Sequence, residues 1–227
     1  MREPQVDLGR QAVAEALGTG LLVAVVVGSG IMAERLTDDM ALMLLGNTLP
    51  TGAMLVVLIA LLGPLSGAHF NPVVTLVLAI RDRWAWRRGL AYIASQVAGG
   101  LAGTMLAQAM FGAPLLELAG QARSGAGLWL AEGVAGFGLV ATILVGSALA
   151  RPALPWLVGL YIVAGYWFTA STCFANPAVT LARAFTDSFS GIRLGDTPGF
   201  ILAQIVGALL ALALTGWLLR PLEEQAS

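Results

Sequence analysis

Long apolar segments alternate with short polar connections along the whole chain. Six of these segments approach or exceed the length that an α-helix needs to cross the hydrocarbon core of a bilayer, roughly 17 to 25 residues. They lie near 10–32, 40–62, 88–110, 127–149, 154–170 and 197–219. The pattern therefore predicts six membrane-spanning helices.

Two further apolar stretches, 71–80 and 176–186, are too short to span, and each begins with an Asn-Pro pair. The first pair opens Asn71-Pro72-Val73 and the second opens Asn176-Pro177-Ala178. Asn is a preferred N-cap, and Pro fits the first helical position, where its missing N–H has no consequence. We therefore predict two half-helices that begin abruptly inside the membrane.

A helix that begins at membrane depth exposes free N–H groups and the positive end of its dipole, which only a polar cavity satisfies. Two matched starts, 105 residues apart, indicate a pore or a binding site near the bilayer midplane. Asn71 and Asn176 would each cap a helix through the side-chain oxygen and point NH2 donors into the lumen. The alternative is that both are ordinary caps in polar loops.

The two halves of the chain repeat each other weakly. Glu15 in the first segment has a counterpart in Glu132 in the fourth, and Gln96 in the third has a counterpart in Gln204 in the sixth. Three spans in each half force the second half to be inverted relative to the first. We expect one channel domain over 1–227, with a first repeat at about 8–110 and a second at about 127–220.

The composition agrees with a membrane protein. Hydrophobic residues make up 58% of the 227 residues and charged residues only 11%, and the mean hydropathy is +0.83. A soluble domain carries about 25% charged residues, so this chain cannot cover a globular surface with them. A net charge of −1 without a basic run argues against nucleic acid as a partner. With one Cys and one His we expect no metal and no cofactor, and the chain has no nucleophile–base pattern of an enzyme.

Arginine placement predicts the orientation, since the chain has no lysine. With both termini cytoplasmic, eight arginines lie inside and four lie outside, as the positive-inside rule favours. The inside set is Arg2, Arg10, Arg81, Arg83, Arg87, Arg88, Arg151 and Arg220, and the outside set is Arg35, Arg123, Arg183 and Arg193.

The stretch Ser66-Gly67-Ala68-His69-Phe70-Asn71-Pro72-Val73-Val74-Thr75 is specific for one family. Together with the paired glutamates and glutamines, it makes the chain resemble the major intrinsic protein family, the aquaporins and aquaglyceroporins. The resemblance implies an all-α membrane protein, an aquaporin-like right-handed bundle of six transmembrane helices plus two re-entrant half-helices in an inverted repeat. It also implies a homotetramer in which each protomer holds its own pore.

The chain departs from the family pattern at the constriction and at the outer selectivity filter. Val73 stands where the family usually has Ala, and Val179 stands where it usually has a filter arginine. The other filter positions fall on Thr51, Ala164 and Cys173, with Gly165 as the alternative to Ala164. The resemblance thus implies a filter of small, uncharged side chains that is wide for the family.

A bacterial subgroup associated with arsenic resistance is similar to this chain in the second motif region, residues 171–183, including the lost arginine. Membership implies passage of arsenite as neutral As(OH)3 and of methylated arsenicals, in a bacterial inner membrane. Cys173 is either a thiol that meets arsenic or mercury or a small filler. For Arg183 we expect that it faces outward and anchors the loop with Asp187, and the alternative is that it reaches back toward the lumen.

The remaining polar residues are expected to support the loops. His69 would fix its loop through a hydrogen bond, and Gln96 and Gln204 would pin the half-helices. Glu15 and Glu132 would accept loop N–H groups as scaffolding, although intramembrane carboxylates also serve proton relays.

We therefore predict a passive channel for small uncharged solutes, arsenite and methylated arsenicals as well as glycerol and water, with the lipid bilayer as its surroundings. A general glycerol or urea facilitator is the first alternative. A proton-coupled carrier that uses Glu15 and Glu132 is the second.

Overall fold

The computed structural model describes residues 6–226, with side chains up to residue 220. Arg2, which enters the orientation argument, lies outside this range. Within the described residues the chain forms eight α-helices joined by short loops and 3-10 turns. They are α1 (Leu8–Leu36), α2 (Met40–Ser66), α3 (Pro72–Arg81), α4 (Trp86–Phe111), α5 (Ala126–Leu149), α6 (Leu154–Phe168), α7 (Pro177–Ala182) and α8 (Thr197–Ala226).

Five of the six predicted spans are helices long and apolar enough to cross a membrane, namely α1, α2, α4, α5 and α8. The sixth, α6, has only 15 residues. It follows a 3-10 turn at Arg151–Ala153 and ends where Thr169 adopts an extended conformation, because the chain there turns toward the second Asn-Pro motif. The half-helix α3 matches its predicted range, whereas α7 has 6 residues and continues as a 3-10 turn, Arg183–Phe185.

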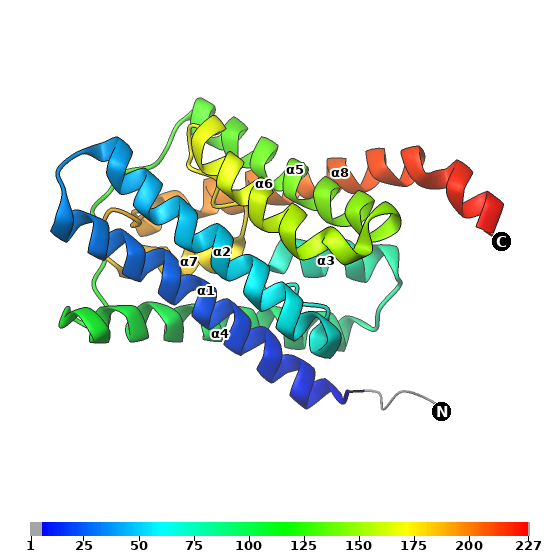
Figure 1. The fold of residues 1–227 in the computed structure, drawn as a ribbon, viewed down its shortest axis with the longest axis horizontal. Helices are drawn as coiled ribbons and strands as arrows, with labels where there is room; N and C mark the ends of the chain where they lie inside the picture. The colour runs from blue at the N-terminus through cyan, green and yellow to red at the C-terminus, as the bar shows by residue number, and fades with distance from the viewer. Residues whose placement is uncertain (1–5, 227) are drawn as a thin grey trace.

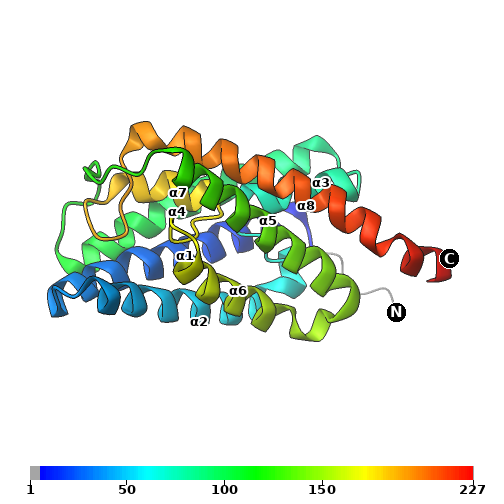
Figure 2. The ribbon, with the colours of Figure 1, turned by 90° about the horizontal axis from the view of Figure 1, so that it is seen from above.

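The inverted repeat is visible in how the long helices pair. Helix α1 packs along α4 in the first half, and α5 packs along α8 in the second (Figures 1 and 2). Glycine permits both close approaches: a Cβ at Gly103 would lie 2.1 Å from the Gly20 carbonyl oxygen, and one at Gly207 would lie 2.0 Å from that of Gly133. Backbones approach this closely in membranes where small residues line the contact.

The two half-helices lie in opposite halves of the bundle. Helix α3 runs toward the end of the molecule at which α1 begins and α8 finishes (Figures 1 and 2). Helix α7 occupies the other half. We call these two ends of the molecule the terminal end and the distal end. The N-termini of α3 and α7 meet between them, so the structure confirms the predicted aquaporin-like architecture.

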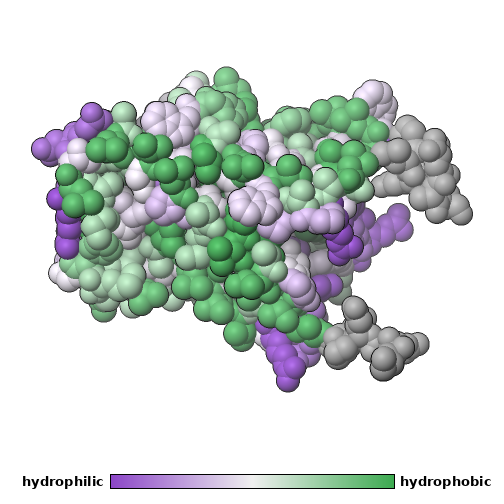
Figure 3. Space-filling view, in the orientation of Figure 1, coloured by the Kyte–Doolittle hydropathy of each residue, from purple (hydrophilic) through white to green (hydrophobic). Residues whose placement is uncertain are grey.

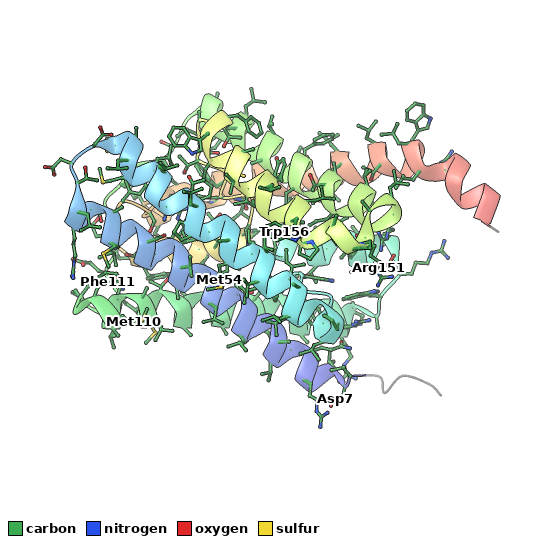
Figure 4. The ribbon with its side chains drawn as sticks, viewed as in Figure 1. Asp7, Met54, Met110, Phe111, Arg151 and Trp156 are labelled. Carbon is green, nitrogen blue, oxygen red and sulfur yellow. The ribbon has the colours of Figure 1, made fainter. Side chains whose placement is uncertain are left out.

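The surface has the distribution of a membrane protein. Hydrophobic residues cover the middle of the molecule, and hydrophilic ones gather at its two ends (Figure 3). Side chains such as Leu61, Leu130 and Trp217 are exposed by 65% or more. Asp7 and Arg151 lie at the terminal end, and Phe111 lies at the distal end (Figure 4). The chain is therefore a multi-pass membrane protein.

Candidate functional site

The start of each half-helix is capped by its own asparagine. The Asn71 Oδ1 accepts a hydrogen bond from the Val73 N–H at 3.0 Å, with Pro72 in the first turn of α3. The Asn176 Oδ1 accepts one from the Ala178 N–H, also at 3.0 Å. These are the N-caps that the two Asn-Pro motifs predict.

The same two asparagines tie the two loops together. The Asn71 Nδ2 donates to the Ala175 carbonyl at 2.8 Å, and the Asn176 Nδ2 donates to the Phe70 carbonyl at 2.8 Å. Each carboxamide thus bonds the residue just before the other asparagine, and one N–H of each is used in this way. Both asparagines line the central cavity, where the second N–H of each carboxamide is available to a solute.

The backbone before each asparagine repeats a strained pattern. Ala68 and Phe70 have φ values of 51° and 49°, and Cys173 and Ala175 have 51° and 48°. Left-handed conformations cost roughly 1–2 kcal/mol in non-glycine residues, so the surroundings must hold them. The offsets from the asparagine are the same in both halves, so the inverted repeat extends to single dihedral angles.

In the first half a buried carboxylate holds this strained loop. The Glu15 side chain, fully buried, accepts from the His69 N–H at 3.0 Å and from the Phe70 N–H at 2.7 Å. The Gln96 Nε2 donates to Glu15 and to the Thr75 Oγ1, at 2.8 Å each. Glu15 therefore links the loop, α1, α3 and α4.

The second half repeats these contacts with other residues. Glu132, also fully buried, accepts from the Phe174 and Ala175 N–H groups at 2.9 Å each. The Gln204 Nε2 donates to Glu132 at 2.5 Å and to the Thr180 Oγ1 at 2.9 Å. The cavity is lined by neither of the two glutamates nor by the two glutamines.

A cavity of about 1140 Å3 runs past both asparagines. Apolar side chains from α1, α2, α5 and α6 form much of its lining, namely Leu22, Val26, Leu55, Leu139, Ile143, Val158 and Ile162. Polar groups line it elsewhere, with Arg151 at the terminal end (Figure 4), Arg81 as the last residue of α3 and Arg183 directly after α7. The lining is thus amphipathic, like a solute that carries hydroxyl groups on a carbon skeleton.

Of the six residues predicted at the constriction, Asn71 and Asn176 line the cavity, and Pro72, Val73, Pro177 and Ala178 do not. Val73 packs instead into a core cluster with Val140 and Ala208, and Val74 takes the place on the cavity. Successive residues of an α-helix point about 100° apart, so a shift of one residue exchanges core for lumen.

Three of the four predicted filter residues, Thr51, Cys173 and Val179, line the cavity. Ala164 does not: it is exposed on the outside of α6, which corrects the prediction. The alternative, Gly165, packs against Cys173 so closely that a Cβ would lie 2.5 Å from the Sγ atom.

Tyr166 lines the cavity from α6 instead of Ala164. Its hydroxyl lies 3.4 Å from the Thr51 Oγ1, so this contact joins α6 to α2. Since sequence counting assigned no aromatic residue here, this ring is a second correction to the predicted filter.

Arg183 is the functional residue that the sequence reasoning placed wrongly. It is only 2% exposed and lines the cavity rather than facing outward. Its Nε donates to the Ser190 carbonyl, and its guanidinium carbon lies 3.4 Å from the Phe174 ring centroid. No ion pair joins it to Asp187 within the described residues. The cavity lining that includes Thr51, Cys173 and Val179 therefore also includes a guanidinium, four residues after Val179.

At the other mouth of the cavity, His69 lines the lumen from the first loop. The His69 Nδ1 lies 3.0 Å from the Thr75 Oγ1, so a hydrogen bond fixes the ring. The ring stacks on Trp84 with centroids 5.3 Å apart. The guanidinium carbon of Arg88 in turn lies 3.7 Å from the centroid of the Trp84 ring. This mouth is thus lined by packed rings beside an arginine.

Comparison with known proteins agrees with this arrangement. The sequence model of the major intrinsic protein family matches residues 3–153. The chain is 63% identical over 217 residues to the aquaglyceroporin AqpS of Rhizobium meliloti, covering 96% of this chain and 93% of that protein. It is 28% identical to a probable aquaporin, AqpM, of Archaeoglobus fulgidus, covering 94% and 98%. The fold matches the X-ray structure of the aquaglyceroporin from Plasmodium falciparum with a TM-score of 0.72 at 21% identity, covering 96% and 100%.

Proposed function

The chain belongs to the major intrinsic protein family of membrane channels, and from this premise we propose that it passes small uncharged solutes that carry hydroxyl groups. Arsenite as As(OH)3, methylated arsenicals, glycerol and water form the proposed set. The protein is a passive small-solute channel and not an enzyme, as its family membership shows.

The observation that carries the proposal is the amphipathic cavity between Asn71 and Asn176. A hydroxylated solute leaving water must replace its hydrogen bonds, or the transfer costs several kcal/mol. The free N–H of each asparagine offers a donor, and the apolar wall accepts the carbon skeleton of glycerol. As(OH)3 is a neutral triol, so it presents the same acceptors to the same donors.

Passage of methylated arsenicals is supported by the side chains at the distal filter. Val179 replaces the family's arginine, and Thr51 and Cys173 are also small. An arginine side chain is larger than valine and carries a fixed charge, so its absence at residue 179 leaves room for a methyl group.

Exclusion of cations is part of the same proposal. The positive ends of α3 and α7 meet at the two asparagines, and each macrodipole places roughly half a positive charge there. A cation at this point meets repulsion and loses its hydration, and a neutral solute does not. Proton and cation conductance should therefore stay undetectable in the unmodified protein.

A general glycerol or urea facilitator, in which arsenic passage is incidental, is the alternative within this class. A proton-coupled carrier would need Glu15 and Glu132 to exchange protons with the lumen. This second alternative has less support, because both carboxylates are hydrogen-bonded to loop N–H groups and lie away from the cavity lining.

The experiment is a solute panel in one proteoliposome preparation, with stopped-flow swelling for water, glycerol and urea and arsenic analysis for arsenite and methylarsonous acid, CH3As(OH)2, which is neutral as As(OH)3 is. We expect both arsenicals to enter at rates comparable to glycerol. Fast glycerol and urea with slow arsenite would favour the general facilitator. Fast water with little else would contradict the solute-channel proposal.

Assembly and placement complete the proposal. We propose one channel domain over residues 1–227 that assembles as a homotetramer. We place it in a bacterial inner membrane, because the relative in Rhizobium meliloti is bacterial. We further propose cytoplasmic termini, supported by the excess of arginine on that side. Native mass spectrometry and labelling of a terminal tag in sealed cells test these two points.

A further inference from the structure

The guanidinium of Arg183 reaches back from the end of α7 toward the filter. Arg183 follows Val179 by four residues, which places both on the same face of the half-helix. Helical side chains lean toward the N-terminus of their helix. The guanidinium stacks on the ring of Phe174, from the loop that precedes Asn176, and Arg183 lines the same cavity as Val179.

The guanidinium is held on one edge and open on the other. The Nε atom donates to the Ser190 carbonyl, and the Phe174 ring covers one face. Phe174 is in turn packed edge-on against Phe200, with centroids 5.2 Å apart. Among the residues that the structure describes, neither Nη group has a hydrogen-bond acceptor or a carboxylate partner. Arg183 is nevertheless only 2% exposed.

A buried guanidinium without partners for four of its five N–H groups is costly unless something in the cavity accepts them. Arg183 lines the cavity together with Thr51, Tyr166, Cys173 and Val179. The acceptor must therefore come from the lumen, as a water or as an oxygen of a passing solute.

We propose that Arg183 is a specificity-determining residue that supplies, from one helical turn further along, the guanidinium that position 179 lacks. Its paired Nη groups donate to solutes that present two oxygen atoms close together, as As(OH)3, methylarsonous acid and glycerol do. Urea offers one oxygen and two N–H2 groups, and these donors meet a cation. This inference deepens the proposed solute channel and rests on it.

The discriminating quantity is the ratio of glycerol to urea permeability, because both solutes are neutral and they differ in the oxygen atoms that they present to the guanidinium. In Arg183→Met we expect this ratio to fall about tenfold, the change that the loss of one charge-assisted hydrogen bond produces. Water permeability, measured in the same vesicles, should change by less than about twofold. Arg183→Lys keeps the charge but not the planar fork, so its ratio should lie between those of the wild type and Arg183→Met.

Arg123 provides a matched control, because it holds the same loop without lining the cavity. It donates to the Phe189 and Gly191 carbonyls at 3.1 and 2.8 Å, and its guanidinium lies 5.3 Å from the Phe174 centroid. Arg123→Met should leave the glycerol-to-urea ratio unchanged. Equal loss of all solutes in Arg123→Met and Arg183→Met would overturn the proposal and assign Arg183 to loop packing.

A rescue variant keeps the test decisive if Arg183→Met alone folds poorly. The double variant Val179→Arg with Arg183→Met returns a guanidinium to the filter from the family position, and it should raise the ratio again. A ratio that stays low in this folded double variant contradicts a role in solute selection. If the wild type passes neither glycerol nor arsenite, the solute channel itself fails; if it passes both and Arg183→Met leaves the ratio unchanged, only this inference fails.

Discussion

The two pore loops, residues 66–82 and 171–187, share a backbone scaffold and close it with different side chains. In both, a buried glutamate accepts the two N–H groups before the asparagine, and a glutamine joins that glutamate to a threonine four residues after the asparagine. The positive φ values recur at the same offsets. This shared part fixes where the two asparagines stand.

The difference begins two residues before each asparagine. His69 occupies that place in the first loop and stacks on Trp84, whereas Phe174 occupies it in the second and stacks on Arg183. The ring of His69 lies at the mouth that also holds Arg88, and the guanidinium of Arg183 lies beside the filter. The contacts common to both loops thus form the frame of the pore, and we propose that solute selection depends on the residues that differ between the two repeats.

The largest expected effect comes from breaking the shared scaffold. Glu15→Ala and Glu132→Ala each leave two loop N–H groups and one N–H of a glutamine amide without an acceptor. Each buried unsatisfied group costs about 1–3 kcal/mol, so each variant should lose several kcal/mol of stability. Yield of monodisperse protein by size-exclusion chromatography measures the loss.

Equal losses of stability in the two glutamate variants would show that the two loops depend equally on their glutamate contacts. A variant that keeps full yield and loses only proton-driven uptake would instead contradict a shared scaffold role of the two glutamates, and would favour the carrier alternative. Thr215→Ala, where α8 lines the cavity, serves as the control for a buried polar change outside the loops, since among the described residues its hydroxyl bonds only α8 carbonyls.

A smaller, selective effect is expected at the place where the two loops differ most from the family. Val179→Arg places a second guanidinium near Arg183, and it should slow glycerol and methylated arsenicals about tenfold while slowing water less. The change narrows the cavity and adds a charge. Stopped-flow swelling and arsenic analysis on one preparation measure it. Equal loss of all three solutes would remove Val179 from the filter.

The smallest effect tests whether the two threonines are equivalent. Thr75→Ala leaves two buried side chains, Gln96 and His69, each without one partner. Thr180→Ala leaves only Gln204 so, because the Asn176 carbonyl that accepts from the Thr180 hydroxyl keeps the Thr180 N–H as a donor. Since a buried group without a partner costs about 1–3 kcal/mol, we expect Thr75→Ala to lower the melting temperature in detergent more than Thr180→Ala. The reverse order would show that the first loop does not depend on the His69 contact.

The sequence predicted the fold well because apolar length and the Asn-Pro caps are local signals. Helices α3 and α7 begin at the predicted asparagines, and the paired glutamates and glutamines occupy equivalent places in the two halves. The length of α6 was overestimated, since hydropathy alone does not show that the chain leaves the helix at Thr169.

The side chains that face the lumen were harder to predict. Counting from the motifs gave Ala164 and Val73, but Tyr166 and Val74 line the cavity, because a helix rotates by about 100° per residue and its rotation depends on packing. Arg183 was assigned to the loop, although its spacing of four residues from Val179 was a signal that both share a face. Burial of a charged side chain requires tertiary contacts, and these are not visible in a single sequence.

The central claim, passive movement of neutral hydroxylated solutes through one continuous cavity, is tested most directly by the concentration dependence of arsenite and glycerol flux. Wild-type proteoliposomes would be measured with and without an imposed proton gradient. Passive movement should give rates that rise linearly with the solute gradient and do not change when the proton gradient is collapsed. Rates that saturate at low solute concentration, or fall when the proton gradient is removed, would contradict it.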